Sequence, residues 1–362
     1  MTWISKKGEA LRDLVESQGG KGAHEIIKKE LKEGTIKPSD FSLQEIWAAT
    51  ERDKDGRVRS IKEAVSSDQF PTITGEIISS TLISAYDNTQ IIGDQLAETV
   101  SSKMETEVYA GFNGSENPEL VLQGEEYKRR DLTEKWTSVR HKKYGTMLEI
   151  TEEALFYDRT GQILMRAAGI GEKAKLYKEK QIVEGVQDIN SNVFKPSGVA
   201  AAFYRTSASG DRKVNSASSN PFGEAGIDAG LKLMHNMVDE NGDPILINQS
   251  NLIGLFPQDL EREAKQMVRS TLVPEGTENA ENIYKGLFKV LTSYFVTAQS
   301  SDTWYLGEFN KDFKWSEVWP LSTSTRADSQ MRFDRDIIMQ LKVRYLGAIT
   351  AIDDKHSYKF TA

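Results

Sequence analysis

The sequence has no cysteine, which excludes disulfide bonds, thiol catalysis and cysteine-based zinc sites and suits a reducing cytoplasm. Histidine is also scarce. The four histidines lie in four separate segments, without a second histidine or a carboxylate at metal-ligand spacing: His24, His141, His235 and His356. We therefore expect no metal site and no bound cofactor.

Long hydrophobic runs are absent as well. No stretch approaches the length of a membrane span, and the first nine residues lack an apolar core of the signal-peptide kind, so we expect no membrane association. The net charge of −8 gives the chain as a whole no attraction to nucleic acid, and any DNA contact has to be local. With 362 residues, 38% of them hydrophobic and 28% charged, the chain can form two or three soluble domains.

Catalytic motifs are missing too: the sequence contains no HExxH, GxSxG, Walker-type lysine or GxGxxG pattern. Residues 51–62 come near a calcium-binding loop, with Asp53, Asp55 and Gly56 in place. Lys62, however, occupies the position that needs a bidentate glutamate, so this segment is predicted to be a turn. No catalytic residue is predicted, and an enzyme is not expected.

The strongest periodic signal lies in residues 151–190. Thr151 is a candidate helix cap, and apolar or small residues then recur every three or four positions, as on one stripe of a long helix over residues 160–188. The stripe consists of Ile163, Ala167, Ile170, Ala174, Tyr177, Ile182, Val186 and Ile189. Gly169 and Gly171 favour a bend near residue 170.

The chain before this helix divides into three parts. Residues 1–60 resemble a small helical unit with few apolar residues, and residues 66–100 indicate an extended arm with one helical turn set. Residues 103–112 alternate polar and apolar up to Asn113-Gly114, and a return strand is predicted within residues 136–150. A two-stranded ribbon of this kind is marginally stable alone, so we expect it to lie on a neighbouring subunit.

The chain after the helix alternates between strands and helices, as in an α/β domain. The predicted elements are a helix at 226–237, a buried strand at 245–247, a helix at 258–269, strands at 290–296 and 302–306, and a terminal ribbon of 339–345 completed by Tyr358 and Phe360. Residues 271–281 are predicted to be an acidic loop.

Three strings carry a resemblance to a known family: residues 144–155 (YGTMLEITEEAL), residues 230–264, and residues 336–353 with the strand IIMQLKVR. Their order resembles the major capsid proteins of tailed bacteriophages, which have the Hong Kong 97-type capsid fold. The resemblance covers about residues 70–360. It implies an α+β fold with an N-terminal helical segment and arm, an E-loop hairpin, a peripheral domain with a long spine helix, and an α/β axial domain.

The resemblance also implies domain limits and a function. The expected parts are an N-terminal helical segment (1–65), an N-arm (66–100), the E-loop (101–150), the peripheral domain (151–198 and 322–362) and the axial domain (199–321). The implied function is self-assembly into hexamers and pentamers of an icosahedral shell that encloses double-stranded DNA. The chain would belong to the virion and assemble in the bacterial cytoplasm. Portal, scaffold, decoration or cement proteins are further expected partners.

Two sets of residues follow from this resemblance. The expected subunit interface lies on the E-loop and consists of Tyr109, Phe112, Asn113, Gly114 and Trp136. Four lysines of the spine helix would meet DNA phosphates without sequence preference if they face inward, and the alternative is a solvated face paired with nearby glutamates. These lysines are Lys173, Lys175, Lys178 and Lys180.

The sequence departs from some relatives in one respect. Lys–Asn cross-linking of the shell needs a lysine on the E-loop tip and an asparagine in the peripheral domain. Residues 111–118 contain no lysine, and no asparagine follows Asn310, so we predict no self-cross-linking and no ladder of covalent multimers on a denaturing gel. Two other interpretations remain open at this stage: an encapsulin-like compartment with protein cargo, and a soluble α/β enzyme or calcium-binding protein.

Overall fold

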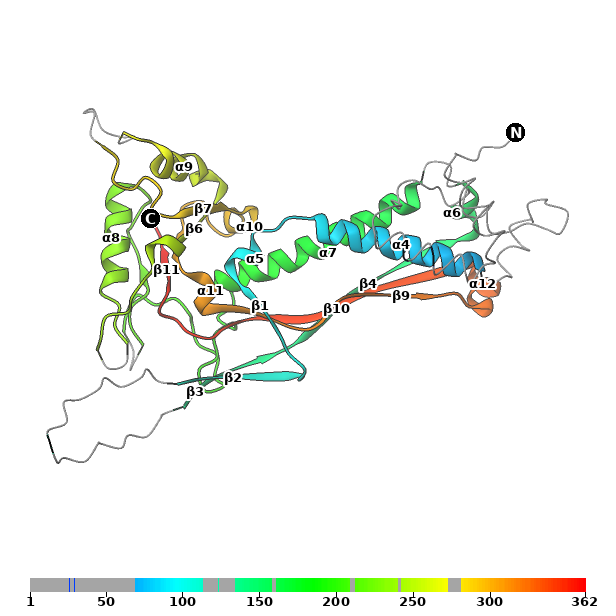
Figure 1. Cartoon of the computed structure of the whole chain (residues 1–362), viewed down its shortest axis with the longest axis horizontal. Helices are drawn as coiled ribbons and strands as arrows, with labels where there is room; N and C mark the ends of the chain where they lie inside the picture. Colours follow the sequence, from blue (N-terminus) through cyan, green and yellow to red (C-terminus); the bar gives the residue numbers. More distant parts are fainter. Residues whose placement is uncertain are drawn as a thin grey trace. The chain divides into compact units, whose positions relative to one another are not determined.

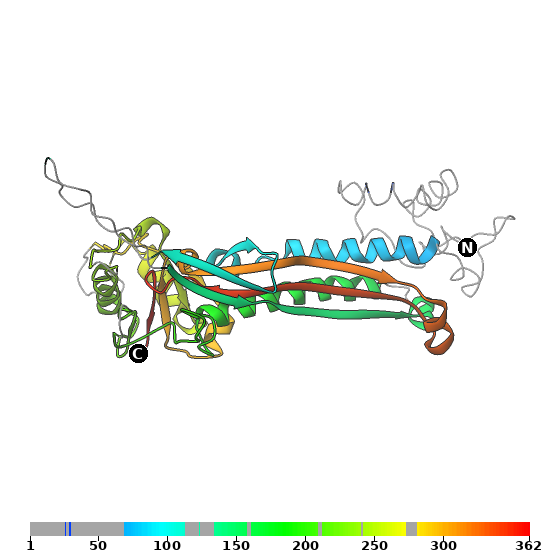
Figure 2. The same ribbon diagram turned by 90° about the horizontal axis from the view of Figure 1, so that it is seen from below.

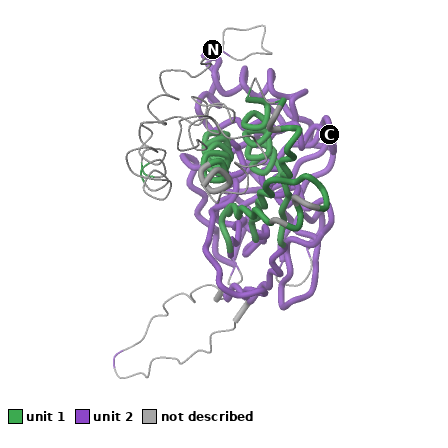
Figure 3. Tube along the Cα trace, turned by 90° about the vertical axis from the view of Figure 1, so that its right-hand side faces the viewer, with its two compact units in different colours: residues 1–90, 143–177, 319–346 green, residues 91–142, 178–318, 347–362 purple. Residues whose placement is uncertain are grey.

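The structure is a computed structural model that describes residues 69–112, 134–157, 161–208, 212–239, 242–272 and 281–362, together with Ile26, Lys29 and Gln123. Two compact units emerge from it (Figure 3). The described part of unit 1 falls within 69–90, 143–177 and 319–346, and that of unit 2 within 91–142, 178–318 and 347–362. Ile26 and Lys29 are helical, while the rest of the expected N-terminal helical unit and the loop at 51–62 lie outside the described residues.

Unit 1 contains a helix where the sequence predicted an extended arm. Residues Gln69–Asn88 form the 20-residue helix α4 (Figure 1). Ile77, Ile78 and Leu82 are fully buried, so the apolar pairs that were interpreted as an extended segment form one side of a helix. The prediction was wrong because the pairs are four to five residues apart, which is helical spacing and not the alternation of a strand.

The long helix predicted over residues 160–188 is confirmed. Helix α7 (Gln162–Val186) follows the short helix α6 (Glu152–Tyr157), whose Ala154 N–H donates to Thr151 Oγ1 at 3.2 Å, as the predicted cap requires. Helix α7 is not interrupted near residue 170. A Cβ atom on Gly171 would lie 2.3 Å from the Leu82 carbonyl oxygen, so this glycine lets α4 and α7 approach closely and does not break the helix.

Long strands accompany these helices in unit 1. The parts of β4 (Lys142–Thr151), β10 (Ile337–Ala351) and β9 (Phe313–Arg326) that belong to this unit lie side by side with β10 in the middle (Figures 1 and 2). Gly75 of α4 packs on Thr325 of β9, which places the helix against the sheet. Strand β9 was not predicted from the sequence. The short helix α12 (Ser329–Arg335) connects β9 to β10.

Unit 2 is organised around a five-stranded sheet in the order β5-β11-β8-β6-β7. The strands are Ser216–Ala217 (β5), Ser357–Phe360 (β11), Trp304–Gly307 (β8), Ile253–Phe256 (β6) and Lys289–Thr292 (β7). Helices α8 (Glu224–His235) and α9 (Glu261–Arg269) pack on it through one buried cluster that includes Phe256, Trp304 and Phe360. Both helices confirm the sequence-based prediction.

Three predicted strands in this unit are corrected. Residues 245–247 do not form a buried strand, and Leu246 is 89% exposed; the buried strand is β6, which follows the 3-10 helix Gln249–Asn251. The strand predicted over 290–296 ends at Thr292, because Ser293 caps the helix α10 (Tyr294–Thr297). Strand β11 does not complete a ribbon with β10; it pairs with β8 and β5.

The remaining elements of unit 2 precede and flank this sheet. Helix α5 (Gly93–Leu96) leads into β1 (Glu98–Ser101), which runs parallel to the start of β9. The 3-10 helix Gln258–Leu260 introduces α9, and α11 (Phe309–Asp312) connects β8 to β9. Strands β2 (Thr106–Phe112) and β3 (Glu134–Arg140) form a separate two-stranded sheet. Their pairing was predicted, but the predicted return strand is interrupted at His141. The residues after it form β4, which belongs to the four-stranded sheet β1-β9-β10-β4.

Candidate subunit interface

The β2–β3 ribbon is attached at its base to strand β9 of its own chain. Tyr109 donates a hydrogen bond to Ser316 Oγ at 2.8 Å, and His141 Nε2 lies 2.7 Å from the same oxygen. His141 Nδ1 is 3.0 Å from the Glu105 carbonyl oxygen. Partial burial raises the pKa of the Tyr109 hydroxyl, which keeps it protonated as a donor. These bonds hold the base of the ribbon in one position.

The two faces of the ribbon have different environments. Residues directly opposite each other across an antiparallel pair share a face, and every second residue does so along a strand. Tyr109, Thr137 and Val139 share the inner face, where Thr137 and Val139 are buried. Val108 and Trp136 lie on the opposite face, where they are 53% and 39% exposed. We call this second face, formed by Val108, Ala110, Trp136 and Ser138, the open face of the ribbon.

Trp136 is also held by the loop that follows α7. The Ser197 N–H donates to the Trp136 carbonyl oxygen at 2.8 Å, and Thr137 forms a bridge to Pro196. Gly198 has a φ of +80°, and a Cβ atom there would lie 2.6 Å from the Trp136 ring. Both the positive φ and the close approach of the Trp136 ring therefore require a glycine at this position. The Trp136 ring thus packs partly on its own chain and partly faces solvent.

The other residues of the expected E-loop interface cannot be placed in the same detail. The backbone of Phe112 pairs with Glu134 at the end of the ribbon. Asn113 and Gly114 lie outside the described residues. Of the five expected interface residues, Tyr109, Phe112 and Trp136 therefore lie on one ribbon, with Tyr109 and Trp136 on opposite faces.

The four lysines of α7 have different surroundings. Lys173 is exposed, whereas Lys178 is buried, with its ammonium 3.6 Å from Glu317 and over the Trp315 ring. Lys175 lies over the Tyr86 ring at 4.9 Å. Lys180 is 3.7 Å from Glu184, an exposed pair that contributes little to stability. The four lysines therefore do not form one exposed basic row.

Unit 1 also presents apolar side chains to solvent. On α7, Met165, Leu176 and Tyr177 are 71%, 45% and 47% exposed, and on β4 Met147 is 51% exposed. Single exposed apolar residues are ordinary on protein surfaces, but several on one helix and its neighbouring strand indicate a surface that another chain can cover.

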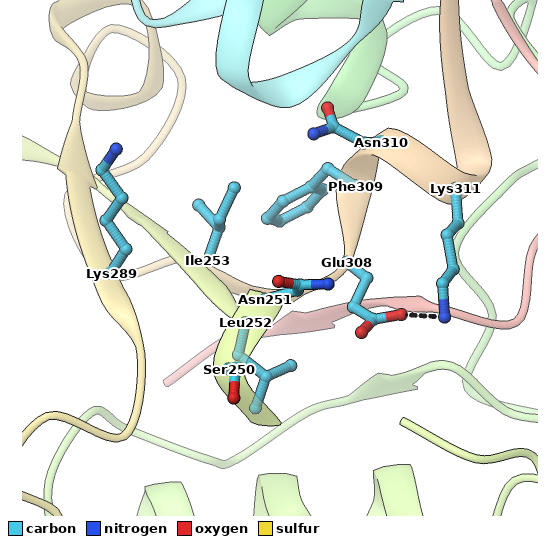
Figure 4. Close-up of a pocket in the computed structure, with 9 residues that line it drawn as sticks. All are labelled: Ser250, Asn251, Leu252, Ile253, Lys289, Glu308, Phe309, Asn310 and Lys311. Atoms are coloured by element: carbon cyan, nitrogen blue, oxygen red, sulfur yellow. Dashed lines mark ion pairs between the residues drawn. The ribbon is translucent and has the colours of Figure 1, made fainter. Parts of the chain in front are cut away.

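One cavity of about 340 Å³ lies in unit 2 between the start of β6, the start of β7 and α11 (Figure 4). Glu308 and Lys311 form an ion pair within it, and Lys289 stands on the opposite side. Glu308 Oε1 also accepts the Asn248 N–H at 3.0 Å. Because this acid is already bound by a backbone N–H and an ammonium, Glu308 is not a free general acid or base.

Sequence reasoning missed two residues that hold the ribbon on its own chain, Ser316 and Gly198. Ser316 lies in the unpredicted strand β9, 175 residues away from its partner His141. No local pattern links the two positions. Gly198 follows Pro196-Ser197, which indicates a turn but not the ring that packs on it.

The long helix, the long strands and the attached β-ribbon together define a structural protein of the Hong Kong 97-type class of shell proteins. The family model described as phage capsid protein matches residues 134–360. The match covers more than half of the chain, and the chain belongs to this family. It is accordingly a capsid shell protein and a component of the virion, with a structural and not an enzymatic role.

Solved capsids have the same fold. The chain is similar to the capsid protein of cyanophage P-SCSP1u, with a TM-score of 0.51, 9% identity, and coverage of 75% of this chain and 88% of that one. It is also similar to the capsid protein of a native GTA particle, with a TM-score of 0.51, 10% identity, and coverage of 74% and 88%. A search of curated protein sequences gives no significant match. Among the described helices, none has a stretch long and apolar enough to cross a bilayer.

Proposed function

We propose that this capsid protein assembles into hexamers and pentamers of an icosahedral shell around double-stranded DNA, with the open face of the β2–β3 ribbon covered by a neighbouring copy. The observation that carries this proposal is the contrast between the two faces of the ribbon. The inner face is packed and hydrogen-bonded to its own chain, while Val108 and Trp136 remain exposed on the open face.

The energetics favour such a contact. A two-stranded ribbon gains little stability alone, and burying apolar area contributes about 25 cal/mol per Å². A second copy that covers Val108, Ala110 and the exposed part of Trp136 therefore stabilises both the ribbon and the ring of subunits. Contacts that repeat around a ring are heterologous and close by rotation, which is the geometry of a capsomer.

The test is a charge placed on the open face. Val108→Glu should abolish rings and shells in negative-stain microscopy and in light scattering, because the glutamate would be desolvated in the interface. Its thermal midpoint as a free subunit should change little, since Val108 is exposed. Ser301→Glu, which adds the same charge at an exposed loop residue of unit 2, is the matched control and should assemble normally. Normal shells from Val108→Glu would contradict the proposed contact.

The contents of the shell separate DNA packaging from the encapsulin-like alternative. Particles recovered from infected cells should hold nuclease-protected double-stranded DNA, whereas a cargo enzyme without DNA would favour the compartment. Contacts to DNA would be few and independent of sequence, because the net charge is −8. Of the four lysines first considered, Lys173 is the most accessible for such a contact, and Lys178 is engaged with Glu317.

The proposed sub-domains follow the family resemblance. Unit 1, with α4, the first part of α7 and the long strands, corresponds to most of the peripheral domain, and the five-stranded sheet of unit 2 corresponds to the axial domain. Strand β11 lies in that sheet, so the axial part would include the C-terminal residues 357–360. We propose that residues 1–60 act as a helical clamp on the inner face of the shell or on a neighbour; normal, equally stable particles from a variant without them would contradict this role.

A further inference from the structure

A cluster of two carboxylates and one imidazole lies in unit 2, at the junction of α11 with the loop between β10 and β11. Asp312, Asp353 and His356 each offer a ligand atom, and these atoms all lie within 4.8 Å of one another. Among the described residues, these three form the group of histidine and carboxylate side chains whose ligand atoms lie close enough to hold one metal ion. No carboxylate was expected at metal-ligand spacing from a histidine, but Asp353 lies three residues before His356. Asp312 lies 44 residues away from His356 along the chain, so the proximity of these two arises from the fold.

The backbone fixes these three residues before any ion arrives. The Ile352 N–H donates to the Asp312 carbonyl oxygen at 2.7 Å, and the Glu308 N–H donates to the His356 carbonyl oxygen at 3.0 Å. The His356 N–H donates to Asp312 Oδ2 at 3.1 Å. The loop and α11 are thus held together at both ends of the cluster, which is the pre-organisation that a metal site needs.

Charge and burial favour a cation at this place. The Asp312 side chain is fully buried, and a buried carboxylate is costly without a compensating positive charge. The cationic partner of Asp312 is His356 itself, 3.0 Å away, which carries a charge only when it is protonated. Two other nearby cationic groups are engaged with other acids: Lys311 pairs with Glu308, and Arg212 pairs with Asp354 at 2.7 Å. The hydroxyl of the fully buried Ser357 lies beside the Asp312 carboxyl without a hydrogen bond of good geometry. A water molecule on a bound ion would satisfy it.

The distances suit a small divalent ion. His356 Nδ1 and Asp312 Oδ1 are 3.0 Å apart. Two ligands of a tetrahedral zinc ion, each about 2.0–2.1 Å from the metal, are about 3.3 Å apart. The pair therefore has to open by only a few tenths of an ångström to admit an ion between the two atoms. Asp353, whose ligand atom lies within 4.8 Å of the other two, would move in as the third ligand. One imidazole and two carboxylates select Zn²⁺ or Mn²⁺ over Ca²⁺, which takes six to eight oxygen ligands.

We propose that Asp312, Asp353 and His356 form a site for a divalent transition-metal ion, Zn²⁺ in the first place, that ties the C-terminal loop before β11 to α11. Zn²⁺ would bind between His356 Nδ1 and one oxygen from each carboxylate, with water in the fourth position. It would replace the hydrogen bond between His356 and Asp312. The site does not depend on the ribbon contact proposed above, because none of its residues lies on the ribbon.

The experiment is a calorimetric titration of Zn²⁺ into the EDTA-treated full-length chain. We expect one saturable site per chain, at least tenfold weaker binding in both His356→Gln and Asp353→Asn, and unchanged binding in His235→Gln. His235 is exposed at the end of α8 and serves as the matched histidine control. Absence of saturable binding, or equal affinity in His356→Gln, overturns the proposal. Tighter binding of Ca²⁺ than of Zn²⁺ overturns the proposed class of ion.

A second measurement on the wild-type chain covers the case in which a variant fails to fold. X-ray absorption of the Zn²⁺-loaded protein should show one imidazole nitrogen among oxygen ligands. A shell of oxygen ligands only, or one with two or more imidazoles, would place the ion elsewhere and overturn the assignment.

Discussion

The two units bury their apolar side chains in different ways. In unit 2, the aromatic rings of Phe256, Trp304 and Phe360 stack on one another inside a cluster that both helices and the sheet close. In unit 1, α4 and α7 share a buried stripe, but α7 still exposes Met165 and Leu176. A subunit of a shell needs both kinds of region. The difference indicates that the five-stranded sheet of unit 2 is stable through its own core, whereas α7 in unit 1, like the ribbon of unit 2, keeps apolar surface for contacts between copies.

The largest expected effect comes from the core of unit 2. Trp304 is fully buried, stacks on Phe360 with centroids 4.2 Å apart, and donates from Nε1 to the Asn220 carbonyl oxygen. Trp304→Ala should lower the free energy of unfolding by about 3–5 kcal/mol, because it leaves a large cavity and an unpaired carbonyl group. Chemical denaturation of the free subunit measures this loss. Tyr294→Ala, at a side chain that is 67% exposed, should change stability by less than about 0.5 kcal/mol.

A smaller effect should distinguish two glycines of α7 in unit 1. Gly171→Ala should destabilise the subunit by about 1–3 kcal/mol, because its Cβ would overlap the Leu82 carbonyl oxygen and push α4 away. At Gly169, no atom lies within 4 Å of the added Cβ. Gly169→Ala should therefore stabilise the helix by up to about 1 kcal/mol. Shifts of the same sign in the two thermal midpoints would contradict the close packing of α4 on α7.

The sequence predicted the elements whose signal is local. The stripe of α7, the Thr151 cap and the pairing of β2 with β3 needed only spacing and alternation. In α4 the helical spacing of the apolar pairs was present but was interpreted as an extended segment, and strand β9 was not predicted. Of the expected interface, Tyr109, Phe112 and Trp136 could be located on the ribbon, but the face that packs on the chain could not be assigned. That assignment depends on Ser316, in a strand that the sequence did not reveal.

A partly buried acid, Asp188, follows the end of α7 in unit 2. Burial raises the pKa of the Asp188 carboxyl to about 6, although the Phe203 N–H donates to it at 2.6 Å. The folded protein thus binds more protons than the unfolded chain between about pH 4 and pH 6, so this group's contribution to stability falls as the pH rises through that window.

The variant that tests this titration is Asp188→Asn. Asparagine can accept the same N–H and tolerates the φ of +52° at this position. Since Asp188 is partly accessible, we expect a gain on the order of 1 kcal/mol above pH 7, or about 2–4 °C in the thermal midpoint, that disappears toward pH 4. Thermal melts at pH 4 and pH 7.5 measure it, and an equal shift at both pH values would contradict the assignment.

The smallest effect on stability should accompany a large effect on assembly. Met165 is 71% exposed on α7, so Met165→Glu should change the free energy of unfolding of the subunit by less than about 0.5 kcal/mol. If another copy covers this surface in the shell, the same charge should strongly reduce the yield of particles in sedimentation, because the carboxylate would be desolvated. Met165→Leu keeps the apolar character and should assemble normally. Full particle yield from Met165→Glu would show that this side chain stays in solvent, and the contrast between the two units would then rest on Leu176 and Met147.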